Sequence, residues 1–371
     1  MRKHITDQPQ ELEVTDTPMA GMADASLEQI FVTDVQRDVR VVEQGDATST
    51  YRLAAALHVN APMSLGAESK ADRGWRLRTG HPREPVKQST IALPPDVTMA
   101  NAFRSIMDGV LAHFMANQPA TAAGDIEGVH QMRIATRRAR ALLLLFQPHI
   151  ERHATTQFTD ALRKLGHIFG EARDWDVFCT EMLASAEQYG LPPSLLDLLR
   201  QPAEAERAAA HARVTAELDA QLLTATVLGL AQSELTNDAP LADLAPDLLR
   251  RLDHKVRHRG RQIARLDFQG LHKVRKSLKK LRYSVEFLSP LLNEKDLRSY
   301  LHRCKALLKR FGALNDGVVA VGLAEQLGGE RQPELAPAVA ALAEWADGQQ
   351  SHIRHQIEED WPRLLEERLL H

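Results

Sequence analysis

Apolar residues from about position 97 onward recur every three or four residues, the spacing of one face of an α-helix. Proline and glycine pairs, such as those at 192–193 and 328–329, interrupt this pattern and mark the ends of elements. We also interpret Gly170 and Gly312 as helix ends. The pattern predicts an all-α fold with helices at residues 97–118, 125–147, 151–170, 174–189, 194–234, 241–266, 269–290, 294–313, 316–327 and 334–368.

Two parts of this helical region are similar to each other. Residues 129–146, VHQMRIATRRARALLLLF, align with residues 271–288, LHKVRKSLKKLRYSVEFL, at an offset of 142. The same offset aligns FGEARDWDV at 169–177 with FGALNDGVV at 311–319, without an insertion between the motifs. A single offset shared by two motifs indicates an internal repeat. We assign repeat 1 to about residues 97–235 and repeat 2 to about 239–370, each long enough for a four-helix bundle.

Both basic segments are amphipathic when they are placed on a helix. With His130 at 0° and about 100° per residue, Arg133, Arg137 and Arg140 fall at about 300°, 340° and 280°. The apolar residues of the same segment cluster on the opposite side, between about 160° and 220°. Repeat 2 carries its charges at equivalent positions, and one additional lysine extends the stripe: His272, Arg275, Lys276, Lys279 and Arg282.

A third basic stripe precedes the second of these helices. Its residues fall within about 100° of one another on a helix: Arg250, His254, Arg257, His258, Arg261 and Arg265. The equivalent stretch of repeat 1, near residues 107–118, has almost no basic residues. We therefore expect the basic surface to be richer on repeat 2.

Positive charge is concentrated in these segments, although the formal net charge of the chain is −3. Residues 250–310 contain 19 Lys and Arg against 5 Asp and Glu, and residues 129–174 contain 8 against 4. One basic stripe is usually a solvated helix face, but three stripes, two of them related by the repeat, favour a binding surface. Such a concentration indicates an anionic partner.

Patterns typical of catalysis or metal binding are weak in this sequence. We find no nucleophile beside a base, no P-loop and no dinucleotide fingerprint. His254 and His258 lie one helical turn apart, as in some metal sites, but their cationic neighbours argue against a metal ion. We interpret Asp174 and Asp316 as structural residues that cap a helix or hold a basic side chain. The sequence therefore predicts no catalytic residues, no metal and no cofactor.

The cysteine content and the hydropathy pattern indicate the cellular compartment of the protein. Only Cys179 and Cys304 occur, whereas a protein of an oxidising compartment would more often carry several paired cysteines. No apolar run follows the basic start, and the longest apolar stretch, residues 141–146, is far below the roughly 20 residues of a membrane span. We expect a cytoplasmic protein that does not act on a membrane.

The doubled helix motif resembles the CHAD domain. The pattern H-x-x-R-x-x-x-[RK]-[RK]-x-R occurs as HQMRIATRRAR and HKVRKSLKKLR, each followed by Phe-Gly and then by an aligned Asp and Val. The resemblance covers about residues 97–370. It implies two four-helix bundles related by pseudo-twofold symmetry, with a basic surface between them that binds inorganic polyphosphate.

Residues of this sequence that match the family motif are the expected ligand groups. They are His130, Arg133, Arg137, Arg138, Arg140, His272, Arg275, Lys279, Lys280 and Arg282. Lys276, which extends the stripe of repeat 2, is also an expected ligand group, and Arg163, Lys164, Lys305 and Lys309 join them by their position on the next helix. A secondary stripe consists of Arg250, His254, Arg257, Arg261 and Arg265.

The first 95 residues resemble part of a CYTH, or triphosphate tunnel, domain. The similar stretches are FVTDVQRDVRVV at 31–42 and LGAESKADRGWRL at 65–77. That family uses an E-x-E-x-K strand, and here Thr15 stands where the lysine is required. Fewer than 100 residues cannot close an eight-stranded tunnel. We interpret residues 1–95 as a truncated, non-catalytic remnant that is partly disordered or β-containing, and residues 96–371 as a CHAD-like domain.

The leading hypothesis is a binding module that recruits the protein to inorganic polyphosphate, with granules as one location. Nucleic-acid binding through the same surface is an alternative, which the scarcity of aromatic residues among the basic ones disfavours. Residual triphosphatase activity of the CYTH-like segment is another alternative. The sequence indicates no protein partner. We also expect protonation of the two histidines to be linked to binding, with tighter binding near pH 6 than pH 8.

Overall fold

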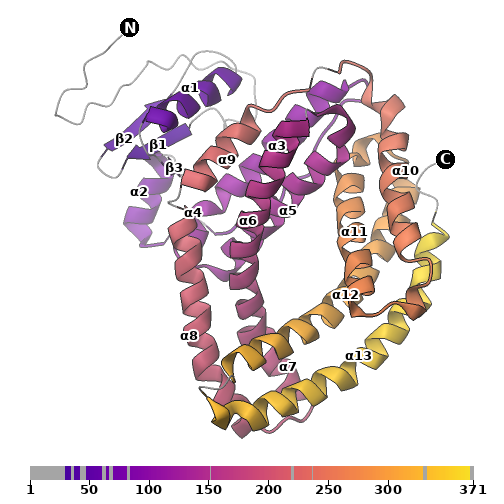
Figure 1. The fold of residues 1–371 in the computed structure, drawn as a ribbon. Coiled ribbons are helices and arrows are strands. Elements are labelled where there is room, and N and C mark those ends of the chain that lie inside the picture. The colour runs from indigo at the N-terminus through magenta and orange to yellow at the C-terminus, as the bar shows by residue number, and fades with distance from the viewer. Residues whose placement is uncertain are drawn as a thin grey trace.

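The computed structural model describes residues 30–34, 37–41, 47–60, 64–66, 70–81, 84–150, 152–218, 221–235, 237–328 and 332–367. The Glu-rich stretch at residues 11–15, on which the CYTH-like assignment partly depends, lies outside these ranges. From residue 99 onward the named elements are helices (Figure 1). The predicted all-α fold of the main domain is confirmed.

Repeat 1 contains a short helix and a terminal helix in addition to its main bundle. Its elements are α3 (Met99–Ala116), α4 (Gln118–Ala122), α5 (Ile126–Leu145), α6 (Arg152–Val177), a π-helical turn (Phe178–Met182), α7 (Leu183–Gln188), α8 (Pro193–Leu218) and α9 (Gln221–Ala231). Repeat 2 contains α10 (Leu241–Arg259), α11 (Phe268–Phe287), α12 (Glu294–Leu327) and α13 (Ala336–Leu365). In each repeat a 3-10 turn follows the motif helix, at Gln147–His149 and Ser289–Leu291.

The two repeats begin side by side, around a local twofold arrangement. Thr98 and Pro240, the N-cap residues of α3 and α10, form an antiparallel bridge. Two equivalent backbone bonds flank it, from Met99 N to Ala239 O and from Leu241 N to Val97 O, each 2.9 Å long. The offset of 142 that relates the sequence motifs also relates Thr98 to Pro240, Met99 to Leu241 and Val97 to Ala239, so it converts one backbone bond into the other. The repeat in the sequence is therefore also a repeat in the structure.

Several helix boundaries differ from the sequence prediction. The predicted breaks after residues 170 and 313 are wrong, because α6 continues through Gly170 and α12 through Gly312. A glycine costs a helix only about 1 kcal/mol relative to alanine, and neighbours such as Phe169 and Trp175 are fully buried. The single helix predicted at 194–234 is divided into α8 and α9, and the one predicted at 241–266 ends at Arg259.

The core is formed by the apolar faces of these helices. Phe103 of α3 packs edge-on against Phe146 at the end of α5, with ring centroids 5.5 Å apart. Trp175 and Phe178 make a similar contact at 5.7 Å, where α6 passes into the π-helical turn. These aromatic residues are completely or almost completely buried.

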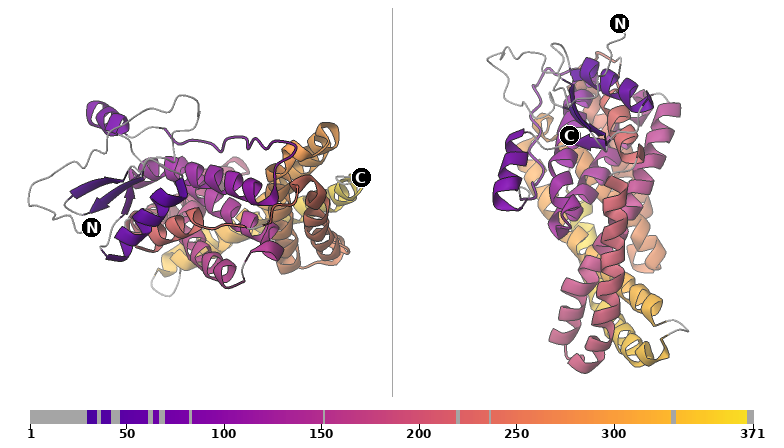
Figure 2. Two further views of the ribbon diagram at one scale, coloured as in Figure 1. Left: turned by 90° about the horizontal axis from the view of Figure 1, so that it is seen from above. Right: turned by 90° about the vertical axis from the view of Figure 1, so that its left-hand side faces the viewer.

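The described residues between positions 30 and 66 form a small unit against repeat 1. The strands β1 (Ile30–Asp34), β2 (Arg37–Val41) and β3 (Ser64–Gly66) form an antiparallel sheet in the order β2-β1-β3. The helix α1 (Ala47–Asn60) packs on the sheet and on α9, and α2 (Lys70–Thr79) follows β3 along the chain. The Gln118 side chain of α4 donates a hydrogen bond to Leu65 O at 2.9 Å. This unit lies at one end of the helical domain (Figure 2).

Residues 84–97 form an extended covering segment on repeat 1. The Asn117 side chain receives a hydrogen bond from Val86 N at 2.9 Å and donates one to Val86 O at 3.0 Å. Arg138 donates a hydrogen bond to Gln88. The covering segment thereby joins α3 to α5.

Among the described residues, no single helix combines the length and the apolar character needed to cross a membrane. The bent pair formed by α8 and Leu222–Ala231 meets that test only when the two helices are taken together, with an angle of 53° between them.

Candidate functional site

The two motif helices lie against each other and bring their basic residues into one cluster. In Figure 1 α5 and α11 are neighbours in the upper part of the molecule, and they are in direct contact. Arg133 Nη2 lies 3.5 Å from Asp174 Oδ1 of α6. The pKa values of Arg133, Asp174 and Lys279 each depend on charged side chains from both repeats. We call this set the central cluster: Arg133, Arg137, Asp174, Arg275, Lys279 and Asp316.

Positive charge in the central cluster is only partly compensated. Burial, followed by Arg137 and Arg275, lowers the pKa of Lys279 to about 6. Burial and Arg137 lower the pKa of Arg133 to about 10, although Asp174 acts in the opposite direction. Three arginines and a lysine of lowered pKa therefore share two carboxylates in a partly dehydrated place. Such an arrangement stabilises an added anion.

Basic side chains of α5 lie against α6 at two of its glycines. A side chain at Gly170 would begin 3.5 Å from Arg133 Nε. A side chain at Gly166 would begin 3.6 Å from Thr136 and 4.0 Å from Arg140 Nη1. The glycine interpreted as a helix end is thus a contact surface for the Arg133 guanidinium.

A second group of cations surrounds Lys280. Burial and then Arg140, Lys255, Arg259 and Lys276 lower the pKa of Lys280 to about 8. These residues come from α5, α10 and α11, and we call them the outer cluster: Arg140, Lys255, Arg259, Lys276 and Lys280. Sequence reasoning missed Lys255 and Arg259. Their spacing of four on a helix was the available signal, because it places both on one face of α10.

The pKa values of the two motif histidines are both lowered, by burial and by nearby cations. Burial and the nearby Arg173 guanidinium lower the pKa of His130 to about 4. Burial and Lys276 also lower the pKa of His272, whereas a hydrogen bond with the Asn315 side chain raises it. The Nδ1 atoms of both histidines are buried without a hydrogen-bond partner. A small pocket beside His272 is lined by Phe268, Leu271, Arg275, Phe311, Leu314 and Asn315.

Arg138 and Arg282 lie outside both clusters, although both belong to the motif. Arg138 is only 3% exposed, and its guanidinium lies 5.0 Å from the ring centroid of Phe287. Arg282 donates a hydrogen bond to Glu286 at 3.2 Å and lies over Tyr283. Glu286 is also the main charged neighbour of Arg138. Their positive charges are therefore committed to the contact between α5 and α11.

The predicted ligand groups on the following helices are mostly exposed. Arg163 of α6 pairs with Asp160 at 2.5 Å and, after burial, is the main charge that lowers the pKa of Arg140. Lys164, Lys305 and Lys309 have exposed side chains. Of these four residues, the contacts described here connect only Arg163 with a cluster.

The secondary stripe on α10 does not continue as the sequence predicts. Its helix ends at Arg259, because Gly260 lies against the indole ring of Trp361, where any larger side chain would collide. Arg261 and Arg265 therefore follow the helix instead of extending its stripe. Arg250 pairs with Asp247 at 2.7 Å and Arg257 with Asp253 at 2.6 Å, while the rings of His254 and His258 stack 6.2 Å apart.

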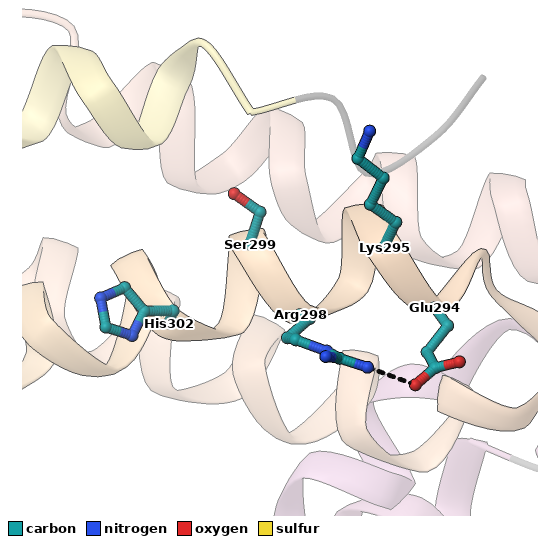
Figure 3. A pocket seen from close by; sticks show the side chains of 5 residues that line it. All are labelled: Glu294, Lys295, Arg298, Ser299 and His302. Carbon is teal, nitrogen blue, oxygen red and sulfur yellow. Dashed lines mark hydrogen bonds and ion pairs between the residues drawn. The ribbon is translucent and has the colours of Figure 1, made fainter.

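A further pocket lies at the start of α12 and is separate from both clusters. It is lined by Glu294, Lys295, Arg298, Ser299 and His302 (Figure 3). Arg298 is paired with Glu294 at 2.5 Å, and both side chains are largely exposed. All of these residues come from one helix, so this pocket lacks the convergence of elements seen in the central cluster.

Comparisons with known proteins agree with this architecture. The structure is similar to the crystal structure of the CHAD domain from the plant Ricinus communis, with 28% sequence identity, a TM-score of 0.65 and coverage of 77% of this chain and 98% of that chain. It is also similar to PptA from Streptomyces chartreusis, with 18% identity, a TM-score of 0.59 and coverage of 71% and 99%, a likeness of fold alone. A search of the curated proteins found no match. A family model described as "CHAD domain" matches residues 105–325, more than half of the chain, and the protein therefore belongs to the CHAD domain family.

Proposed function

We propose that the protein is a binding module for inorganic polyphosphate and that the central cluster holds the phosphates. The observation that supports this most strongly is the meeting of three arginines and a lysine from α5 and α11 around only two carboxylates. Repulsion among these side chains disfavours the protonated form of Lys279 in the free protein. A polyanion relieves that repulsion, so binding is favoured.

The residue types suit a ligand that consists only of phosphate. Arginine offers a planar set of donors that can engage two phosphate oxygens, and lysine offers a mobile charge. Side chains one helical turn apart are about 5.4 Å apart along the axis and can meet successive groups of a flexible chain. Such a module would attach the protein to polyphosphate granules in the cytoplasm.

The proposal is for binding without catalysis. We retain the interpretation of residues 1–95 as a CYTH-like remnant in which Thr15 replaces the required lysine. The intact protein is expected to release no phosphate from triphosphate or polyphosphate in the presence of Mg²⁺ or Mn²⁺. Sustained release by the purified chain would contradict this part of the proposal and favour a phosphohydrolase.

Calorimetry of the intact protein with long-chain polyphosphate tests the proposal directly. The central variant carries four substitutions, Arg133→Ala, Arg137→Ala, Arg275→Ala and Lys279→Ala. We expect the wild type to bind tightly, with affinity that falls steeply as salt is added, because binding releases counterions. We expect the central variant to lose most of this affinity while its circular dichroism remains helical.

A matched variant controls for the loss of positive charge alone. Arg200→Ala, Arg213→Ala, Lys295→Ala and Arg298→Ala remove four cations that are exposed on α8 and at the start of α12. This variant should bind polyphosphate nearly as well as the wild type. Equal losses in the two variants, or equal affinity of the wild type for duplex DNA, would replace a specific site with general attraction of polyanions.

A further inference from the structure

The surface around Lys280 has a counterpart in repeat 1, and the two surfaces have diverged. At the offset of 142, residues of repeat 2 correspond to less basic residues of repeat 1. The pairs are Lys255 with His113, Arg259 with Asn117, Lys276 with Ile134 and Lys280 with Arg138. Three cationic positions of repeat 2 are therefore a histidine, an amide and an apolar residue in repeat 1.

The repeat 1 surface is closed by the protein's own chain. The exposed fractions of His113, Asn117 and Arg138 are 5%, 0% and 3%. The covering segment binds Asn117 through the backbone of Val86 and Arg138 through the Gln88 side chain. The one cation that remains, Arg138, has Glu286 of the other repeat as its main charged neighbour. The covering segment therefore fills the space on this side, and Glu286 offsets the positive charge of Arg138.

The repeat 2 surface is open and lacks the equivalent carboxylate. Lys255, Arg259 and Lys276 are exposed, and Lys280 is half-buried. Arg140 of the other repeat approaches Lys280, in the way that Arg282 approaches Arg138. However, Leu144 stands at the position that corresponds to Glu286. The cations of the outer cluster therefore face one another without the anion that neutralises their counterparts.

Arg259 is also held in place beside this surface. Its guanidinium donates hydrogen bonds to the Ser277 hydroxyl and to Lys273 O of α11, the second at 3.4 Å. Ser277 in turn donates to Lys273 O at 2.9 Å. A cation that is fixed by its neighbours loses less conformational entropy when a ligand binds.

The outer and central clusters are continuous on α11. Lys279 belongs to the central cluster and Lys280 to the outer one, and their directions on the helix differ by about 100°. Lys276 precedes Lys279 by three residues and Lys280 by four, so it lies beside both on the surface of α11. A flexible anionic chain could therefore pass from one cluster to the other without leaving the cationic surface.

We propose that the outer cluster is a second phosphate-binding site, which holds a later stretch of the same polyphosphate chain that occupies the central cluster. This inference rests on the proposed function. It implies selectivity for chain length, since a short chain engages one cluster and a long chain engages both.

Binding of tripolyphosphate and of long-chain polyphosphate to the intact protein tests the second site. The outer variant is Lys255→Ala with Lys280→Ala, and its charge-matched control is Lys295→Ala with Arg298→Ala. We expect the outer variant to lose roughly tenfold in affinity for the long chain and to show a salt dependence whose slope is smaller by up to about 2. Its affinity for tripolyphosphate should change much less. Lys255→Arg with Lys280→Arg should restore long-chain binding.

The outcomes separate this inference from the proposed function. If the wild type binds long-chain polyphosphate and the outer variant binds it as well as the control variant does, the second site is refuted and the central cluster stands. Equal fractional losses for short and long chains would also refute a site reserved for the later part of the chain. If the wild type binds neither ligand, the proposed function itself fails.

Discussion

Neighbouring arginines of the motif serve different interfaces. Arg137 takes part in the central cluster, whereas Arg138 is buried between the repeats, beside Phe287 and Glu286. One step along a helix turns a side chain by about 100°, so adjacent basic residues face different surroundings. The motif in the sequence marks both as ligand groups. Only Glu286 and the covering segment, which are distant in sequence, show that Arg138 is already paired.

If the protein binds polyphosphate as proposed, Lys279 should make that binding depend on pH. Its pKa is about 6 in the free protein, lowered by burial and by Arg137, Arg275 and Arg133 against the opposite effect of Asp316. A bound polyanion raises this pKa, so near pH 7.5 the protein should take up protons on binding and bind more weakly as the pH rises from 6 to 8. Calorimetry in buffers of different ionisation enthalpy measures the uptake.

The variant Lys279→Arg provides the control for this pH dependence. Arginine keeps its charge throughout this range, so the variant should bind with a smaller proton uptake than the wild type. His130, with a pKa of about 4, should contribute little between pH 6 and pH 8. We therefore keep the expectation of tighter binding at lower pH, but we assign it to protonation of Lys279 instead of the histidines. Identical proton uptake by the wild type and the variant would exclude Lys279 as its source.

At the scale of elements, both motif helices begin at an aspartate cap. Asp125 accepts a hydrogen bond from Gly128 N at 2.8 Å, and Asp267 accepts one from Gly270 N at 2.7 Å. These caps fix where α5 and α11 start and, with it, the direction of every basic side chain that follows. Because equivalent aspartates cap both helices, the repeat in the sequence predicts where each helix begins.

Loss of either cap should destabilise the protein to a similar extent. Asp125→Ala and Asp267→Ala are each expected to lower the free energy of unfolding by about 1 kcal/mol, whereas Asn at either position should preserve most of it. Urea denaturation followed by circular dichroism measures these changes. A neutral alanine variant at one position would show that the two helix starts are not equivalent.

Other elements depend on contacts that the local pattern does not contain. The basic pattern continues beyond Arg259, but Trp361 of α13 packs on Gly260 and the helix stops there. The apolar and basic stripes predict α10 correctly up to that point. They do not predict which face of α10 meets α11, and for this reason Lys255 and Arg259 were missed. The repeat offset aligns the basic residues of the central cluster with one another, because it compares two copies of one helix.

At the scale of the whole molecule, the repeats are joined along several contacts. α5 packs on α11, α8 packs on α13, and the backbone bridge at Thr98 and Pro240 connects their starts. Arg138 is a central part of the first contact. Residues of both repeats are therefore needed to bury the same core.

Substitution of Arg138 should destabilise both repeats together. Arg138→Ala removes a buried cation that packs on Phe287, bonds to Gln88 and has Glu286 as its main charged neighbour. It is expected to lower the free energy of unfolding by roughly 2–4 kcal/mol in a single transition. The exposed pair of Arg200 with Glu187 is a suitable control, for which Arg200→Ala should cost about 1 kcal/mol or less. Calorimetric and van't Hoff enthalpies of unfolding should agree. Separate transitions for the repeats would contradict this picture.

The local twofold arrangement at Thr98 and Pro240 has a consequence for the direction in which the proposed ligand would bind. A linear polyphosphate reads the same from either end, whereas a nucleic-acid strand has a defined polarity. Two repeat-related helices present similar donors to a chain that enters from either side, so the central cluster offers two nearly equivalent ways to seat an unpolarised polymer. For a strand with polarity, the two orientations would differ, and only one could match the donors fully.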